Sequence, residues 1–185
     1  YPTKNSDLTL NLFNRLAYEL SVLIGEPTDT GLVNTPSILA EDMVAISAIY
    51  WISEHSNLAF DELVDIFSER RQIQWHEQQE IVGHLSNVKW YDPSVGTGAF
   101  PLAIIKLLAR FNIKGIDALR GIIAGSEIDP LLLKAAHIRI AFLISALHNV
   151  DFSVAMNFSE GMFVNQDALI RFTEPSETPK TKSIP

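Results

Sequence analysis

The feature that most constrains the fold is the alternation of short apolar strands with longer helical segments in the second half of the chain. Each expected strand leads into an acidic residue. The strands are predicted over residues 88–91, 121–125 and 162–164, leading to Asp92, Glu127 and Asp167. Alternation of this kind is typical of a parallel sheet with right-handed crossovers and helices on its faces. The sequence therefore predicts an α/β fold over residues 88–170, with a helical N-terminal segment over residues 1–87 in front of it.

Amphipathic patterns predict helices throughout the N-terminal segment. Residues 7–24 carry leucines at a spacing of three to four, and helical patterns also occupy residues 60–67 and 75–85. Between them, Thr35 is expected to cap a helix that opens with Pro36, because proline suits the first helical position. One face of that helix is predicted to carry Leu39, Met43, Ile46 and Tyr50. The tryptophans Trp51, Trp75 and Trp90 are expected to anchor the core.

The most apolar stretch, residues 131–150, is predicted to be a buried helix. Asp129 supplies its cap and Pro130 its first position. Charged and imidazole side chains interrupt the stretch and would be costly in lipid; they are Lys134, His137, Arg139 and His148. No membrane association is therefore expected, and the lack of cysteine agrees with a reducing, cytoplasmic location.

The composition excludes several kinds of site. A formal net charge of -8 argues against strong nucleic-acid binding by this chain itself, because phosphate contacts depend on clustered Lys and Arg. Without cysteine there is no disulfide, zinc–thiolate site or thiol nucleophile. His76, Glu80 and His84 have helical metal-ligand spacing, but a solvated or partner-facing surface is preferred and no metal site is predicted. Residues 171–185, rich in Pro, Ser and Thr, are predicted to be a tail or linker.

The glycine turn after the first strand is the leading candidate for a ligand site. In open parallel sheets ligands bind beyond the carboxyl ends of the strands, where glycine lets the backbone come close. Gly96 and Gly98 supply this turn, and carboxylates at strand ends such as Asp92 and Glu127 are costly to bury unless they are paired or liganded. Pro101 stands where the third glycine of a dinucleotide fingerprint would fall, which weakens a nicotinamide-dependent oxidoreductase as an alternative.

Four motifs resemble those of amino-methylating DNA methyltransferases, in the order of the gamma arrangement. They are Asn34-Thr35-Pro36-Ser37, Asp92-Pro93-Ser94-Val95-Gly96-Thr97-Gly98-Ala99-Phe100, Gly125-Ser126-Glu127-Ile128-Asp129-Pro130 and Gln166-Asp167-Ala168-Leu169, with Gln166 where a glycine is usual. The chain is thus similar to the S-adenosylmethionine-binding part of gamma-class DNA adenine-N6 methyltransferases of restriction–modification systems. The run from Ala99 to Leu102 also resembles large enzymes that join methylation with restriction or phage defence.

This resemblance implies a partial Rossmann-like methyltransferase fold with S-adenosylmethionine as cofactor. It places Thr35 and Asp92 at the amino acid end of the cofactor and Glu127 at both ribose hydroxyls. By the same resemblance, Gly96 and Gly98 leave room for the cofactor and Phe100 closes the pocket. Ile128 is expected to pack on the adenine face, and Asp167 to accept a hydrogen bond from the adenine amino group. Each residue also has a structural interpretation: Thr35 as a helix start, Phe100 and Ile128 as core residues, and Asp167 as a turn residue.

The catalytic motif of the family is expected to lie outside this chain. An Asn-Pro-Pro-aromatic motif should follow the third motif, yet no Asn-Pro pair occurs, and the chain starts at Tyr1. We therefore expect a fragment without catalytic residues that reaches DNA through other regions. A missing fourth strand would leave the first strand with a bare edge, to be covered by an added segment, an endonuclease or specificity domain or subunit, or a second copy of the chain.

Two further alternatives stay open at this point. An RNA or protein methyltransferase fragment would use a similar core, although the early Thr35-Pro36 element disfavours it. A non-catalytic module would bind the cofactor or a partner without turnover.

Overall fold

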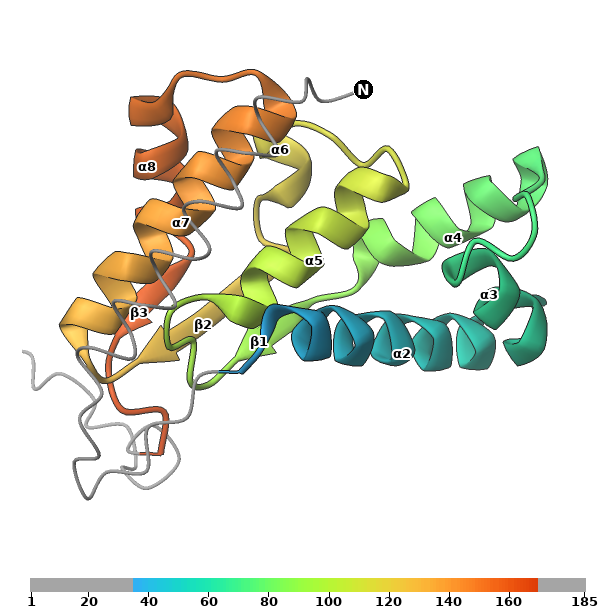
Figure 1. The fold of residues 1–185 in the computed structure, drawn as a ribbon, viewed down its shortest axis with the longest axis horizontal. Coiled ribbons are helices and arrows are strands. Elements are labelled where there is room, and N and C mark those ends of the chain that lie inside the picture. The colour runs from blue at the N-terminus through green and yellow to red at the C-terminus, as the bar shows by residue number, and fades with distance from the viewer. Residues whose placement is uncertain (1–34, 170–185) are drawn as a thin grey trace, which may run out of the picture.

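Residues 35–169 are the part of the chain that the computed structural model describes, and they form seven helices and one parallel sheet of three strands (Figure 1). In chain order the elements are α2 (Ser37–His55), α3 (Phe60–Phe67), α4 (Trp75–Asn87), β1 (Trp90–Asp92), α5 (Ala99–Arg110), α6 (Ile116–Leu119), β2 (Ile123–Glu127), α7 (Pro130–His148), α8 (Phe152–Glu160) and β3 (Phe163–Asn165). The predicted helix over residues 7–24 and the predicted tail over residues 171–185 lie outside the described residues.

The sheet has the order β1-β2-β3, and both pairings are parallel, as the alternation of strands and helices predicts. Asp92 pairs with Gly125, and Glu127 pairs with Asn165. β1 begins two residues later than expected because α4 extends to Asn87, where the N–H of Val88 still donates to the carbonyl of His84 at 3.0 Å. The mixed α/β architecture is therefore confirmed. The two acidic residues Asp92 and Glu127 lie at the carboxyl ends of the adjacent strands β1 and β2.

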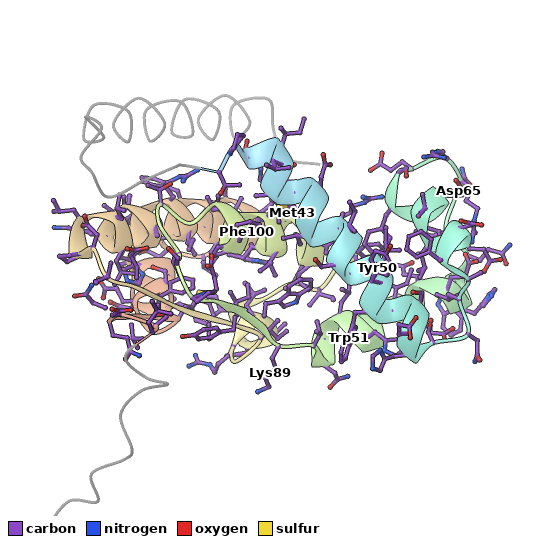
Figure 2. All side chains as sticks on the ribbon, turned by 90° about the horizontal axis from the view of Figure 1, so that it is seen from below. Met43, Tyr50, Trp51, Asp65, Lys89 and Phe100 are labelled. Carbon is purple, nitrogen blue, oxygen red and sulfur yellow. The ribbon has the colours of Figure 1, made fainter. Side chains whose placement is uncertain are left out.

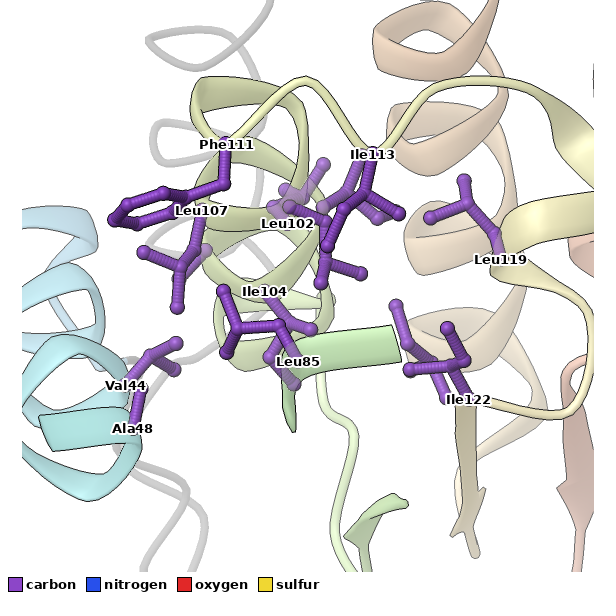
Figure 3. Close-up of a cluster of buried hydrophobic side chains, with 14 of the residues drawn as sticks. Val44, Ala48, Leu85, Leu102, Ile104, Leu107, Phe111, Ile113, Leu119 and Ile122 are labelled. Atoms are coloured by element: carbon purple, nitrogen blue, oxygen red, sulfur yellow. The ribbon is translucent and has the colours of Figure 1, made fainter. Parts of the chain in front are cut away.

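Helices α5 and α7 lie side by side on one face of the sheet, and α2 packs against α5 beyond β1 (Figure 1). Side chains from α2, α4, α5 and the strands meet in a single buried cluster (Figure 3). α2 to α4 belong to the predicted N-terminal segment and the sheet to the segment after residue 87, so the two segments share this core.

Helix α2 buries a different face from the one that carries the large predicted side chains. Ala40, Val44, Ala48 and Ile52 are buried, whereas Leu39, Met43, Ile46 and Tyr50 are between 46% and 56% exposed. Apolar residues occupy both sides of α2, and the alanines let α5 pack closely, so the small-residue face is the one that enters the core. The predicted cap is also wrong: Pro36 occupies the N-cap position, and no side chain caps the helix.

Two of the three predicted core tryptophans are on the surface. Trp75 is 76% exposed and Trp51 is 43% exposed, while Trp90 packs against the core. Trp75 is the first residue of α4, and the ring of Trp51 stacks on His55 one turn further along α2. Tryptophan is rarely buried completely, so residue type alone did not decide the burial of these rings.

Helix α7 confirms the predicted long helix and its cap. Asp129 accepts from the N–H groups of Leu131 and Leu132, and Pro130 takes the first position. Among the described residues this one helix is long and apolar enough to cross a membrane by length and composition, but 44% of that window is buried inside the fold, and the core helix of a soluble protein passes the same test. The short helices α6 and α8 were not predicted from the sequence.

Candidate functional site

The carboxyl ends of β1 and β2 bring the two strand-end acids together. Asp92 ends β1 opposite Gly125, and Glu127 ends β2 two residues later. A side chain at Gly125 would be impossible without movement, because its Cβ would lie 2.4 Å from the carbonyl oxygen of Asp92 and 2.7 Å from a methyl group of Val95. The glycine therefore lets the turn after β1 lie directly on β2.

Glu127 ties the glycine turn to the rest of the sheet. Its side chain is only 4% exposed, and its Oε2 accepts from the N–H of Gly96 at 2.7 Å. Its Oε1 accepts from the N–H of Asp129 at 2.9 Å, immediately before α7. A carboxylate oxygen can accept two hydrogen bonds, so each of these oxygens keeps acceptor capacity for a ligand hydroxyl.

Asp92 carries a buried acceptor without a partner. Its Oδ1 accepts from the N–H of Ser94 at 3.0 Å, whereas its Oδ2 is buried and has no hydrogen-bond partner among residues 35–169. Burial raises the pKa of the Asp92 carboxyl, the Ser94 amide opposes this rise, and the nearby charge of Glu127 adds to it. A buried, unsatisfied carboxylate oxygen is costly, and a cationic donor bound at this position would relieve the cost.

The two glycines of the turn adopt the left-handed backbone that the motif requires. Gly96 has φ +54° and faces open space, since nothing lies within 4 Å of where its Cβ would be. Gly98 has φ +88°, and its Cβ would lie 3.2 Å from the Cβ of Ala136 in α7. Gly98 therefore serves helix packing, and Gly96 is the position at which a ligand can approach the backbone.

A cavity of about 240 Å³ lies next to Asp92, between α2, α5 and β1. Phe100, from the first turn of α5, lines it opposite Met43 of α2, and both are labelled in Figure 2. Trp90 also lines this cavity, and its Nε1 is a buried donor without a partner among the described residues. Phe100 and Asp92 thus line the same cavity, which offers one unpaired acceptor and one unpaired donor among the described residues.

Ile128 and Asp167 are two further residues of the predicted cofactor site. Ile128 is 66% exposed, which excludes its interpretation as a core residue. Asp167 is half-buried, and its Oδ1 accepts from the N–H of Leu169 at 2.9 Å, the local turn expected of an aspartate. The adjacent N–H of Gln166 donates to the carbonyl of Glu127 at 3.1 Å, so Asp167 lies near the end of β2.

Thr35 makes no hydrogen bond to this group that the structure describes. It is half-buried ahead of α2, and α2 lines the cavity from Met43 onward. No hydrogen bond described within residues 35–169 joins Thr35 to Asp92, Glu127 or the glycine turn.

Three residues that support the site were missed at the level of sequence. Asn165 donates from Nδ2 to the carbonyls of Glu127 at 2.8 Å and Ile128 at 3.0 Å. Ser126 is fully buried and donates to the carbonyl of Pro93 at 3.2 Å. Arg139 of α7 donates to Thr97 in the glycine turn. In the sequence, Asn165 and Ser126 could have been recognised only by their closeness to the acidic residues that follow the strands. No local sequence pattern pointed to Arg139.

The described residues contain no group of three or more histidine or acidic side chains that could hold a metal ion. In particular, the Glu80 carboxylate accepts from the N–H of Asn57 at 3.0 Å. This contact gives Glu80 a structural partner from outside its own helix.

Comparison with known proteins assigns the chain to no family. No family model, characterised protein or solved structure matches the chain. The argument for a function therefore depends on the motifs and on the geometry of the site.

Proposed function

We propose that this chain is the S-adenosylmethionine-binding part of a DNA adenine-N6 methyltransferase from a cytoplasmic restriction–modification or phage-defence system, with a partial Rossmann-like fold. The observation that carries the proposal is the buried Oδ2 of Asp92, which has no partner among the described residues and lies beside a glycine turn. S-adenosylmethionine carries an ammonium and a sulfonium, so a cationic ligand of this kind would stabilise the ionised carboxylate.

Glu127 is proposed to bind the ribose. Its two oxygens each hold one backbone N–H and retain capacity for one hydroxyl each. A hydrogen bond to a charged group contributes about 1.5 to 3 kcal/mol. In this arrangement Gly96 and Glu127 contact the cofactor from adjacent positions, because they are already joined by a hydrogen bond.

The other proposed contacts follow from where the side chains lie. The side chain of Ile128 is 66% exposed and is therefore available to pack on the adenine ring. Asp167 would accept from the adenine amino group with the carboxylate oxygen that does not close its own turn. Phe100 would close the pocket beside Asp92, and Thr35 would meet the amino acid end of the cofactor.

The edge of β1 supports the proposal that other regions complete the sheet, carry the catalytic motif and bind DNA. The N–H of Trp90 donates to the carbonyl of Ile122 at 2.7 Å, so in a parallel ladder the backbone groups of Tyr91 point to the opposite edge. Tyr91 is 51% exposed. A strand from another domain or subunit, or from a second copy of this chain, would pair there.

Calorimetric titration of the full 185-residue chain with S-adenosylmethionine, and with NAD as the control ligand, tests the proposal. Gly96→Ala and Gly121→Ala form a matched pair, because both glycines have positive φ (+54° and +73°) and both face open space. Left-handed alanine costs about 1 to 2 kcal/mol at either position. We expect similar losses of stability, but a loss of S-adenosylmethionine affinity of about tenfold or more for Gly96→Ala only.

A folded wild-type chain that does not bind S-adenosylmethionine would contradict the proposal. Binding of NAD instead would favour the oxidoreductase alternative. Equal binding by the two glycine variants would show that a ligand does not approach the turn at Gly96.

A further inference from the structure

Helix α7 packs against the glycine turn at Gly98, whereas Gly96 faces open space. Ala136 and Ile140 lie 3.2 and 3.5 Å from the position that a Cβ on Gly98 would take. Arg139 lies on the same side of the helix, since residues three and four apart share a face. Its Nη1 donates to the carbonyl oxygen of Thr97 at 2.6 Å and to the Thr97 hydroxyl at 3.0 Å.

The partly buried environment of Arg139 makes its hydrogen bonds to Thr97 energetically important. The side chain is partly buried, and burial lowers the pKa of the Arg139 guanidinium, which reflects the cost of removing its charge from water. A hydrogen bond from a charged donor to a backbone carbonyl is stronger than a neutral one, and 2.6 Å is a short distance for such a bond. Arg139 therefore holds the glycine turn through both the backbone carbonyl and the side-chain hydroxyl of Thr97.

Together with Glu127, Arg139 fixes the peptide groups on both sides of the Gly96–Thr97 bond. The N–H of Gly96 donates to Glu127 at 2.7 Å, and the N–H of Gly98 donates to the carbonyl of Val95 at 2.8 Å. The carbonyl of Thr97 is held by Arg139. The peptide between these anchors is the part of the turn that faces the open space at Gly96.

We propose that Arg139 is a positioning residue that holds the glycine turn, through Thr97, in the shape that admits S-adenosylmethionine. This inference rests on the proposed function. Arg139 itself does not touch the cofactor: it sets the direction of the Thr97 carbonyl and thereby the conformation of Gly96. Binding then requires no reorganisation of the turn, which is the usual advantage of a preorganised site.

The test compares Arg139→Met and Arg139→Lys in the full chain, with Lys134→Met as a matched control on the exposed side of the same helix. Calorimetry gives both the affinity for S-adenosylmethionine and the number of binding-competent molecules. We expect Arg139→Met to weaken binding by about tenfold or more, Arg139→Lys by about threefold, and Lys134→Met not at all. Amide exchange at Gly96 and Gly98 should accelerate in Arg139→Met while β2 stays protected.

Two further measurements separate positioning from general stability. Thr97→Val removes the hydroxyl contact alone, so it should weaken binding less than Arg139→Met and add nothing to it in the double variant. Millimolar methylguanidinium should restore binding to Arg139→Ala, since the cation can occupy the space left by the side chain. If Arg139→Met proves unable to fold, Arg139→Lys and Thr97→Val still report on the contact.

The outcomes are distinct. If the wild-type chain binds S-adenosylmethionine and folded Arg139→Met binds it equally well, the positioning role is wrong and the proposed function stands. A reduced number of sites with unchanged affinity would show that Arg139 only stabilises the fold and would also overturn the inference. If the wild-type chain does not bind, the proposed function fails and the inference fails with it.

Discussion

The carboxylate of Glu127 accepts a hydrogen bond of 2.7 Å from the backbone N–H of Gly96, thirty-one residues earlier in the chain. The same side chain accepts from the N–H of Asp129, so one buried acid joins the turn after β1 to the start of α7. Glu127 is therefore both a structural tie and a proposed cofactor ligand. Measuring both stability and affinity in variants of Glu127 separates the two roles.

Glu127→Gln should keep the shape of the side chain but lose one of the two backbone contacts, because an amide nitrogen cannot accept from an N–H. We expect the free energy of unfolding to fall by about 1 to 2 kcal/mol and the affinity for S-adenosylmethionine to fall at least tenfold. Chemical denaturation and calorimetry measure the two effects. Glu127→Ala should lower both quantities further, and a variant that loses stability but keeps full affinity would assign Glu127 to the fold alone.

Asp92→Asn should stabilise the free chain at neutral pH while it weakens cofactor binding. The pKa of Asp92 is raised above 3.8, chiefly by burial, so the stability that its protonated form contributes is fully present below pH 3.8 and is lost as the pH rises through the higher folded-state pKa. Asparagine is neutral at every pH and avoids this loss. Thermal unfolding at pH 4 and pH 7 should show a gain for Asp92→Asn that is larger at pH 7.

A matched control for Asp92→Asn is Asp117→Asn, since Asp117 is an exposed residue of α6 away from the sheet edge. It should change neither stability nor binding appreciably. Lower stability of Asp92→Asn at pH 7 would mean that the ionised form of Asp92 is satisfied in the free chain, and the main support for a cationic ligand would be lost.

The sequence predicted the sheet and the glycine turn more successfully than it predicted the packing of the N-terminal helices. Glycine and proline signals are local, and they located the turn at Gly96 and the start of α7 at Pro130 within a residue. The buried face of α2 depends on which apolar side α5 meets, a long-range property that the spacing of Leu39 and Met43 does not contain. Long-range contacts also explain why Arg139 was missed: its partner Thr97 is forty-two residues away.

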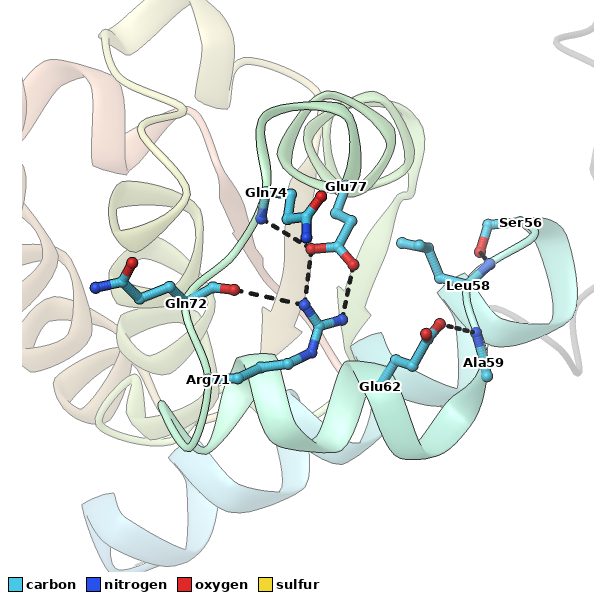
Figure 4. A network of polar contacts seen from close by, with 8 residues as sticks. All are labelled: Ser56, Leu58, Ala59, Glu62, Arg71, Gln72, Gln74 and Glu77. Atoms are coloured by element: carbon cyan, nitrogen blue, oxygen red, sulfur yellow. Dashed lines mark hydrogen bonds and ion pairs between the residues drawn. The ribbon is translucent and has the colours of Figure 1, made fainter.

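Acid should weaken the fold through a contact between the α3–α4 loop and the first turn of α4. Glu77, only 8% exposed, forms a bidentate pair with Arg71 at 2.7 and 2.9 Å and accepts from the N–H of Gln74 at 2.8 Å (Figure 4). The hydrogen bonds from Arg71 are the largest cause that lowers the pKa of Glu77 from 4.5 to about 2. The resulting stability is present above pH 4.5 and is lost as the pH falls through about 2.

Glu77→Gln removes this dependence. We expect it to cost about 2 kcal/mol at pH 7, from the loss of the charged pair and of one of its two hydrogen bonds with Arg71, because the amide oxygen of glutamine can still accept from the N–H of Gln74. Denaturant unfolding of the wild-type chain and the variant at several pH values should show curves that converge toward pH 2. Glu62→Gln is the control, because the Glu62 carboxylate accepts from the N–H of Ala59 at 3.1 Å and acts on Arg71 only through its charge, with no hydrogen bond between the two side chains described. Parallel curves at all pH values would contradict the assignment to Glu77.

Gly83 and Gly125 should respond to substitution by alanine in opposite directions. At Gly125 the added methyl group would meet the backbone oxygen of Asp92 at 2.4 Å, and backbone can yield only by separating β1 from β2. At Gly83, within α4, nothing lies within 4 Å, and alanine is the better helix former by roughly 0.5 to 1 kcal/mol. We expect Gly125→Ala to destabilise the chain by about 3 kcal/mol, in the range of severe overpacking, and Gly83→Ala to stabilise it slightly. Unfolding midpoints measure both changes, and a Gly125→Ala variant as stable as the wild-type chain would show that the turn after β1 does not lie on β2 as closely as these distances require.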